Sequence, residues 1–410
     1  MDSHNSISSR LPAELDRYPA KMVSGLAARL VDRYASGGAS LLDPFCGSGA
    51  ILVAGKRRGM RVAGVDINPI SSLFARVKLC GFDPEKANST LVRIVDAALS
   101  GVYYLPIKWD LKDYWFTPAT LSKFEALRGA IRHFELHDSD EKAAVLLALC
   151  LAVRVCSRAD QRSPKPFISK IARQERFGRH YDPLRETQDL LKLLATYYGS
   201  STPKSAGYEF LIADIASKGV LVNRLPKHSH VITSPPYINA QDYFRNFKLE
   251  LHVLEGLLPF KVSKLKDRFI GTERGNLLQA GQETQPYPLI ERVPQFRRLQ
   301  ERSRRHANIV RRYFLDMSMA VENISDCLEP GGVMVVVCGD NLIAGERIKT
   351  WQILATMIEE AGFCLFDSFA DPIKDRLLAP KRLGHKGLIK EEIVMAFRNP
   401  TLTPPFMGTQ

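Results

Sequence analysis

Residues 40–69 read SLLDPFCGSGAILVAGKRRGMRVAGVDINP, and this stretch decides the fold. A short apolar run leads into the turn DPFCGSG at 43–49, a helical run follows, and a second apolar run at 61–65 ends in Asp66. Strand, glycine-containing turn, helix, strand and acid in this order are typical of the opening of a doubly wound parallel sheet. The sequence therefore predicts an α/β fold that binds a ligand at the carboxyl ends of its strands.

The composition is that of a folded globular protein. Of the 410 residues, 45% are apolar and 25% charged, and the formal net charge is +13. Such an excess of positive charge is typical of proteins with a polyanionic partner, nucleic acid above all. The apolar stretches are too short to cross a bilayer and the first residues lack an apolar signal core, so we expect no membrane partner and a cytoplasmic location. The seven cysteines form no CxxC pair, so we expect reduced thiols and no metal.

The turn at 43–49 has the features of a cofactor site. Gly47 and Gly49 stand where the backbone must approach a ligand closely. A dinucleotide fingerprint needs a third glycine where Leu52 stands, which disfavours a nicotinamide or flavin enzyme. Asp66 stands at the end of the second strand, where a carboxylate can accept hydrogen bonds from both hydroxyls of a ribose. In the alternative interpretation the glycines only form a turn and the aspartate caps a helix.

A second motif, TSPPY at 233–237, follows another apolar run. Two consecutive prolines fix φ twice and remove two donors, so the turn is rigid and presents carbonyl acceptors. The hydroxyl of Ser234 and a proline carbonyl can accept hydrogen bonds from both hydrogens of an exocyclic amine, which aims the nitrogen lone pair at a methyl donor. Tyr237 offers an aromatic face on which an extruded base can stack. An ordinary Pro-Pro turn is the alternative, but the glycine turn in the same chain favours catalysis. The predicted catalytic residues are Ser234, Pro235, Pro236 and Tyr237.

Together, LLDPFCGSG (41–49), VDINP (65–69) and TSPPY (233–237) resemble the bacterial DNA amino-methyltransferases, the N4-cytosine and N6-adenine enzymes of restriction-modification and related systems. The resemblance implies a Rossmann-like class I methyltransferase core with a helical insertion and S-adenosyl-L-methionine as the cofactor. It further implies direct methyl transfer to a flipped base in DNA. Ser234, in the place where adenine enzymes more often have Asp or Asn, indicates cytosine N4 as the acceptor.

The resemblance also implies which residues bind the cofactor. The first motif would hold its methionine part, Asp66 its ribose, and Asp214 would lie beside its adenine ring. RYPAK at 17–21 resembles the segment that closes over the methionine end, although Lys21 can equally be a surface lysine and Asp214 a loop carboxylate. We interpret Cys46 as a small buried filler and not as a nucleophile. The predicted cofactor-binding residues are Tyr18, Pro19, Ala20, Lys21, Asp43, Pro44, Phe45, Cys46, Gly47, Gly49, Asp66, Ile67, Asp214 and Ile215.

Two parts of the chain carry no motif of this family. We expect 1–82 to be the first part of the core with the cofactor motifs, 83–204 a helical insertion and candidate for target recognition, 205–258 the core with TSPPY, 259–315 a basic irregular excursion and candidate for DNA contact, and 316–410 the end of the sheet. Residues 292–312 contain eight arginines. This cluster predicts contacts with DNA phosphates, and the alternative is a helix face exposed to solvent. A basic loop with interleaved aromatics at 157–181 predicts nucleic-acid contact or a solvated connector. The predicted DNA-binding residues are Arg297, Arg298, Arg304 and Arg305.

Other functions remain compatible with these motifs. The acceptor could be adenine N6 instead of cytosine N4. An RNA guanine-N2 methyltransferase would share the glycine turn, although such enzymes usually carry Asp-Pro-Pro-Tyr. A catalytically silent DNA-binding subunit could retain the fold, but the intact motif at 234–237 argues against it. We expect double-stranded DNA as the substrate and a cognate restriction endonuclease as a candidate partner.

Overall fold

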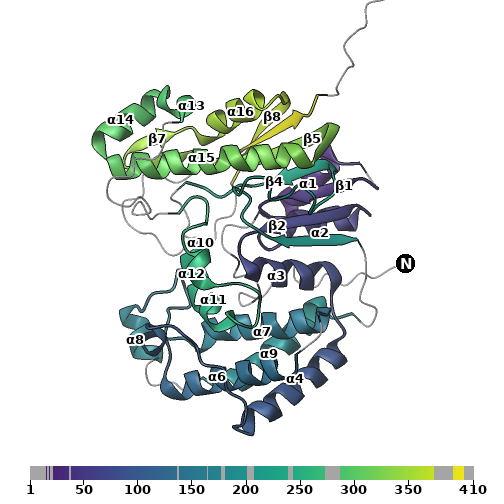
Figure 1. The fold of residues 1–410 in the computed structure, drawn as a ribbon, viewed down its shortest axis with the longest axis vertical. Coiled ribbons are helices and arrows are strands. Elements are labelled where there is room, and N and C mark those ends of the chain that lie inside the picture. The colour runs from purple at the N-terminus through teal and green to yellow at the C-terminus, as the bar shows by residue number, and fades with distance from the viewer. Residues whose placement is uncertain are drawn as a thin grey trace, which may run out of the picture. The chain divides into compact units, whose positions relative to one another are not determined.

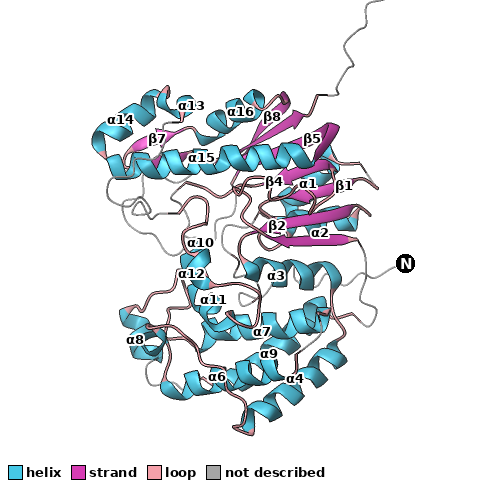
Figure 2. Cartoon of the chain, viewed as in Figure 1, coloured by secondary structure: helices cyan, strands magenta, loops and turns pink. Residues whose placement is uncertain are grey.

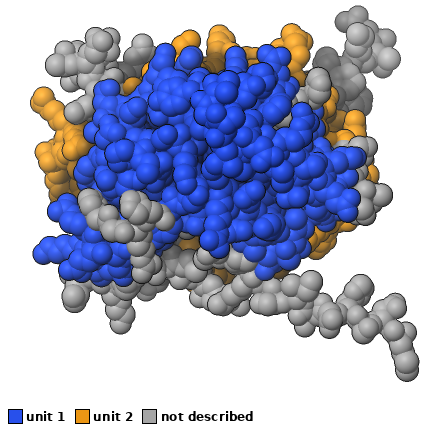
Figure 3. All heavy atoms as spheres, turned by 90° about the horizontal axis from the view of Figure 1, so that it is seen from below, with its two compact units in different colours: residues 1–21, 76–204, 245–262 blue, residues 22–75, 205–244, 263–410 orange. Residues whose placement is uncertain are grey.

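The computed structural model describes residues 15, 18, 22–36, 38–135, 138–163, 165–176, 181–200, 207–238, 243–272, 287–373 and 391–400. It divides into two compact units, coloured separately in Figure 3. Unit 1 comprises Met1–Lys21, Arg76–Lys204 and Arg245–Val262. Unit 2 comprises Met22–Ala75, Ser205–Phe244 and Ser263–Gln410. Within the described ranges every strand belongs to unit 2, and unit 1 consists of helices and loops (Figure 2).

Unit 2 is built on a seven-stranded sheet in the order β3-β2-β1-β4-β5-β9-β8. The first five strands are parallel, β9 runs antiparallel to β5, and β8 runs antiparallel to β9. This topology confirms the predicted α/β fold with a Rossmann-like, doubly wound, mostly parallel sheet. The strands are β1 (Ser40–Asp43), β2 (Arg61–Asp66), β3 (Tyr208–Ile212), β4 (His228–Thr233), β5 (Leu328–Cys338), β8 (Cys364–Pro372) and β9 (Glu391–Arg398).

Helices cover both faces of this sheet, because neighbouring strand residues point to opposite sides. Leu41 faces α2 (Ala50–Arg57), which lies so close that a Cβ on Gly55 would stand 2.6 Å from the leucine side chain. Leu42 instead belongs to the core beneath α15 (Arg304–Cys327) and α16 (Thr350–Glu360), which lie along the sheet in Figure 1. The remaining elements of unit 2 are α1 (Ser24–Tyr34), α13 (Pro288–Glu291), α14 (Pro294–Arg302) and the hairpin of β6 (Asn341–Ile343) with β7 (Glu346–Ile348).

Unit 1 is a helical bundle around α7 (Asp140–Cys156), thirteen of whose residues are buried. Side-chain caps define where its helices begin: Asp83 accepts from two backbone N–H groups at the start of α4 (Pro84–Leu99), and Ser139 caps α7. Three helices cross the boundary between the units: α3 (Pro69–Cys80), α10 (Tyr243–Asn246) and α12 (Val262–Leu265). The other helices of unit 1 are α4 (Pro84–Leu99), α5 (Lys112–Trp115), α6 (Pro118–His133), α8 (Lys170–Arg176), α9 (Pro183–Tyr198) and α11 (Lys248–Leu254).

The two units divide the chain at other positions than the segments expected from the sequence, and 1–21 and 76–82, expected in the core, belong to unit 1. The segment 205–258 was expected to be part of the core with TSPPY, and its residues from Arg245 onward belong to unit 1. The physical reason is packing, because α11 is buried at Leu249, Leu251, Val253 and Leu254 and lies against α7. No helix of the described residues is both long and apolar enough to span a membrane.

Candidate active site

The predicted motifs meet at one edge of the sheet of unit 2. DPFCGSG begins at the last residue of β1, Asp66 is the last residue of β2, and Asp214 follows β3 by two residues. Ser234 directly follows β4. Because these strands are parallel neighbours, their carboxyl ends lie side by side, at the edge where open α/β sheets bind ligands.

Both glycines of the turn have backbone conformations that favour glycine. Gly47 and Gly49 have φ values of 48° and 81°, in the left-handed region that favours glycine. A Cβ on Gly49 would lie 3.1 Å from the Cβ of Ala75, so the turn also needs glycine there to approach α3. The N–H of Cys46 donates to the carbonyl of Val65 at 3.1 Å, which ties the turn to β2.

Asp66 holds this turn in place. Its carboxylate accepts hydrogen bonds from the N–H of Gly47 at 2.9 Å and from the N–H of Asn68 at 2.8 Å. Burial raises the pKa of Asp66 to about 6, although the backbone hydrogen bonds oppose the shift. Next to it Asn68 is 1% exposed, and its Nδ2 has no hydrogen-bond partner among the described residues. A buried donor without a partner beside a carboxylate with spare lone pairs is suited to a polar ligand.

Asp43 links the glycine turn to the second motif. It is 4% exposed, and its Oδ1 accepts hydrogen bonds from the hydroxyl of Thr233 at 2.6 Å and from the N–H of Phe45 at 3.2 Å. Burial raises the pKa of Asp43 to about 7, and the negative charge of Asp66 adds to the shift. Sequence reasoning did not foresee this contact, because the two partners lie 190 residues apart.

The TSPPY turn is fixed from several sides. Pro235 is buried, whereas Ser234, Pro236 and Tyr237 are half-buried. The phenol of Tyr237 donates a hydrogen bond to the carboxylate of Glu392. Burial raises the pKa of Tyr237 well above its usual value, and the neighbouring carboxylate adds to this shift. Tyr237 therefore stays a neutral donor over the whole physiological range.

Asp214 and Ile215 lie beside Asp66, because Ile212 pairs with Asp66 across β3 and β2. Asp214 accepts from the N–H of Ala216 at 3.1 Å and forms an ion pair with Arg268 at 3.0 Å. Ile215 is buried at 4% exposure. Asp214 therefore makes contacts that stabilise its own loop. It also lies at the carboxyl ends of the strands, where open α/β sheets bind ligands.

The structure describes some of the other predicted cofactor-binding residues and leaves others outside the described ranges. Pro44 and Cys46 are buried, and Phe45 and Ile67 are half-buried at the same edge. Burial, with the charges of Asp66 and Asp43, raises the pKa of the Cys46 thiol well above its usual value, so it is not an activated thiolate. Tyr18 belongs to unit 1, where its ring lies 5.1 Å from that of Phe247. Pro19, Ala20 and Lys21 lie outside the described residues.

All four predicted DNA-binding arginines are exposed. Arg298 pairs with Glu346 at 3.0 Å, and the Nε of Arg297 donates to the carbonyl of Glu291 at 3.0 Å. Arg304 and Arg305 are exposed at the start of α15. This helix packs along the sheet and ends directly before β5 begins, so its start lies toward the carboxyl edge that carries the motifs.

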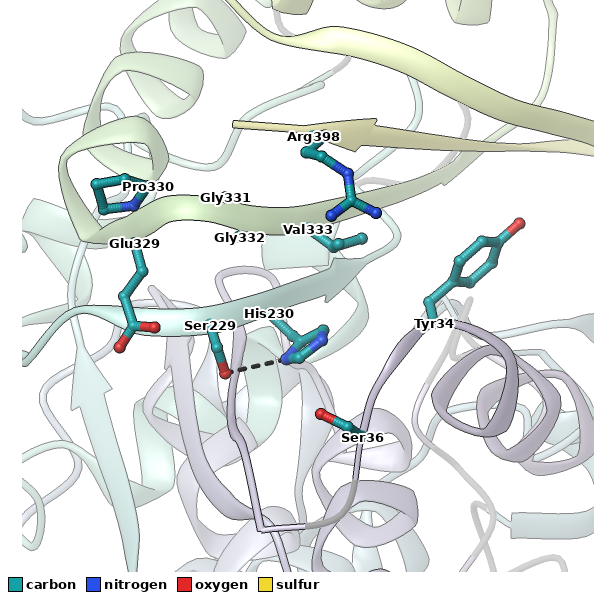
Figure 4. A pocket seen from close by; sticks show the side chains of 10 residues that line it. All are labelled: Tyr34, Ser36, Ser229, His230, Glu329, Pro330, Gly331, Gly332, Val333 and Arg398. Atoms are coloured by element: carbon teal, nitrogen blue, oxygen red, sulfur yellow. Dashed lines mark hydrogen bonds between the residues drawn. The ribbon is translucent and has the colours of Figure 1, made fainter. Parts of the chain in front are cut away.

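A cavity of about 360 Å³ lies at the opposite, amino-terminal edge of the sheet (Figure 4). It is lined by the starts of β4 and β5, the end of α1 and Arg398 at the end of β9. None of the predicted site residues lines it, so the motifs and not this cavity define the candidate site. The described ranges contain no group of three or more His, Cys, Asp or Glu that could hold a metal ion.

Comparisons with known proteins agree with the motifs. No protein-family model matches the chain. It is 21% identical over 420 residues to Type II methyltransferase M.MvaI of Kocuria varians, covering 93% of this chain and 90% of the relative. Type II methyltransferase M.BsoBI of Geobacillus stearothermophilus is 27% identical over 289 residues, 61% of this chain and 54% of the relative. M.MjaII of Methanocaldococcus jannaschii, also a Type II methyltransferase, is 33% identical over 79 residues, 19% of this chain and 15% of the relative.

Among solved structures, TrmN from Thermus thermophilus matches with 11% identity and a TM-score of 0.32, covering 94% of this chain and 52% of that one. So loose a superposition adds nothing to the argument. The sequence relatives are more informative, since M.MvaI aligns with nearly the whole chain. The chain is thus similar over nearly its whole length to one Type II methyltransferase, and over parts of its length to two others.

Proposed function

We propose that this protein is a site-specific DNA methyltransferase that transfers a methyl group from S-adenosyl-L-methionine to the exocyclic N4 amino group of a flipped cytosine. The observation that carries the proposal is the hydrogen bond from Thr233 to Asp43. It joins the turn suited to a cofactor directly to the turn suited to an amine, as a transfer between two bound partners requires. The names of the relatives support methyl transfer as the reaction.

The residues at the edge fit the proposed cofactor. Gly47 and Gly49 have left-handed backbone conformations in the turn, and the carboxylate of Asp66 can accept hydrogen bonds from ribose hydroxyls. The unpartnered Nδ2 of Asn68 offers a further donor there. When bound, S-adenosyl-L-methionine supplies a methyl group made electrophilic by its sulfonium. We propose Asp214 and Ile215 for the adenine ring, and Tyr18 to Lys21 for the methionine end.

The chain's own residues would act by positioning. Ser234 and the Pro235 carbonyl would accept hydrogen bonds from the amine, so that the nitrogen lone pair is localised and directed. Tyr237 would stack against the flipped base, and its neutral phenol is compatible with a dry pocket. No covalent nucleophile is required, which agrees with the raised thiol pKa of Cys46.

We propose that unit 1 reads the target sequence in DNA. Its loop between α7 and α8 is held in one shape: Asp160, 4% exposed, accepts from Arg162 and from Ser169, each at 2.6 Å. Phe167 of this loop is 40% exposed, and Lys170 and Arg173 are exposed on α8, which directly follows the loop. Ordered cations interleaved with an aromatic suit phosphates and bases. Arg304 and Arg305 are the proposed phosphate contacts of unit 2.

The test is incubation with tritiated S-adenosyl-L-methionine and unmethylated DNA, with total RNA in parallel, followed by nucleoside analysis by mass spectrometry. N4-methylcytosine in DNA is the expected product, and Ser234→Ala should abolish it. N6-methyladenine would move the acceptor to adenine, and label in RNA alone would favour a guanine-N2 enzyme. No label, together with no binding of the cofactor by calorimetry, would indicate a silent DNA-binding subunit. A neighbouring gene for an endonuclease cutting the same sequence would supply the proposed restriction partner.

A further inference from the structure

We propose that Glu392 is a positioning residue for the reaction, because it holds the ring of Tyr237 in the orientation in which the flipped base stacks on it. The inference rests on the proposed function and adds a residue that no motif identifies. Glu392 is half-buried near the start of β9, 155 residues from its partner. Its carboxylate accepts the phenol hydrogen of Tyr237, and a hydrogen bond to a charged acceptor is stronger than a neutral one.

Other contacts already hold the backbone around Tyr237. Only the orientation of its ring remains to be fixed. Asn341 donates from Nδ2 to the carbonyl of Ile238 at 3.0 Å, and the hydroxyl of Thr350 donates to Asn341 at 2.8 Å. On the other side, a Cβ on Gly271 would stand 2.5 Å from the carbonyl oxygen of Tyr237. These contacts hold the main chain but leave the side-chain torsions of Tyr237 undetermined. The bond to Glu392 fixes the far end of the ring.

The sheet explains why a residue from so late in the chain reaches this turn. Ile393 pairs with Cys338, the last residue of β5, so β9 begins at the carboxyl edge and runs away from it. Glu392 therefore stands one residue beyond the pairing with β5, at the edge where β4 ends in Thr233. Cys338, Asp340 and Tyr243 also lie near this corner, and each has a raised pKa because of burial. Because their pKa values are raised, the Cys338 thiol and the Tyr243 phenol are neutral at pH 7. The carboxylate that accepts the phenol hydrogen of Tyr237 is that of Glu392.

An anchored ring changes catalysis in a specific way. A base can stack on a free tyrosine ring only after the ring is ordered, and ordering a side chain costs free energy on binding. If Glu392 removes that cost, its loss should slow methyl transfer without weakening the cofactor site. We expect the single-turnover rate of Glu392→Ala to fall about tenfold, the size of effect that one lost hydrogen bond to a charged group produces. Glu392→Gln retains an oxygen acceptor and should recover most of the rate.

The experiment is a double-mutant cycle on the full-length protein. Single-turnover methylation would be measured for wild type, Glu392→Ala, Tyr237→Phe and the double variant, with Glu391→Ala as the matched control on the exposed neighbour. Cofactor affinity would be measured by calorimetry and base flipping by 2-aminopurine fluorescence. We expect both single variants to be slowed alike, the double variant to be no slower, cofactor affinity to be unchanged, and flipped-state fluorescence to fall in each.

The inference alone would be overturned by a full rate in Glu392→Ala, or by a double variant slowed by the product of the two single effects. The second pattern would mean that Glu392 acts independently of Tyr237. A third outcome would also overturn it: Glu392→Gln does not recover the methylation rate, and all variants unfold at a lower temperature. Glu392 would then have only a structural role. A wild-type protein that methylates neither DNA nor RNA would overturn the proposed function itself, and the inference with it.

Discussion

The hydroxyl of Thr233 donates a 2.6 Å hydrogen bond to the buried carboxylate of Asp43, so the last residue of β4 is bound to the last residue of β1. These are adjacent parallel strands, paired at Leu42 and Val231. The two motifs that the sequence keeps 190 residues apart are therefore one hydrogen bond apart at the edge of the sheet.

Thr233→Val tests how much this link contributes. Valine keeps the shape but removes the donor, which leaves Asp43 buried with one hydrogen bond fewer. We expect a loss of about 1–3 kcal/mol in the free energy of unfolding, measured by urea denaturation, and a slower methyl transfer. Thr356→Val on the exposed face of α16 is the matched control and should change stability by less than about 0.5 kcal/mol. Equal stability of the two variants would contradict the prediction.

Asp43 should make stability depend on pH. Its pKa in the folded state is about 7, above the value of 3.8 for an unperturbed aspartate, so the folded state binds more protons than the unfolded state between these limits. Stability contributed by this group is therefore present below about pH 4 and is lost as the pH rises through 7. Asp43→Asn should flatten this decline in urea unfolding measured from pH 4 to 8. An unchanged decline would assign it to other groups, Asp66 first among them.

Asp66→Asn should weaken cofactor binding. The amide oxygen can still accept one hydrogen bond, but the second oxygen and the charge are lost. We expect the Kd for S-adenosyl-L-methionine, measured by calorimetry, to rise about 10- to 100-fold, as for loss of a hydrogen bond to a charged acceptor. Asp96→Asn on the exposed face of α4 is the matched control. An unchanged affinity for S-adenosyl-L-methionine would mean that Asp66 only stabilises the glycine turn.

Exposed arginines of unit 2 should set the salt dependence of DNA binding. Arg304→Gln with Arg305→Gln removes two exposed cations, and we expect the slope of log K against log salt to fall in magnitude by about 2. Arg298→Gln is the control, because its guanidinium already pairs with Glu346, which is 7% exposed. That variant should affect the β6–β7 hairpin more than DNA binding. An equal loss of slope in both would show that the ion pair opens on DNA.

The loop between α7 and α8 in unit 1, together with the start of α8, should contribute to DNA binding separately. Lys170→Ala with Arg173→Ala is expected to lower affinity for the cognate DNA sequence more than for random DNA, because the loop is proposed to read the target. The matched control is Arg185→Ala with Lys192→Ala on α9, where both side chains are more than two-thirds exposed. Competition binding with cognate and random duplexes measures the ratio. A uniform loss on both duplexes would make the loop a phosphate contact only.

The sequence predicted those parts of the fold that local pattern determines. The glycine turn after β1 and the strand ending in Asp66 follow from residue types that leave few alternatives. β8 was not predicted, because most of its residues are exposed and give no alternating apolar signal. The pairing of Arg298 with Glu346 was also missed, since it depends on the β6–β7 hairpin meeting α14. Long-range partners such as Glu392 leave no local signal, and only the fold brings them to the site.

The reversed direction of β9 has a consequence for how this edge could be redesigned or could have evolved. Glu392 and Arg398 sit at opposite ends of one strand, the first at the edge with the motifs and the second lining the cavity at the other edge. If β9 ran parallel to β5, its two ends would be exchanged. Arg398 would then lie at the end of the sheet that carries the motifs, and Tyr237 would face a cation instead of an anion. The orientation of a single terminal strand thus selects the sign of the charge available to the chemistry, independently of every motif upstream.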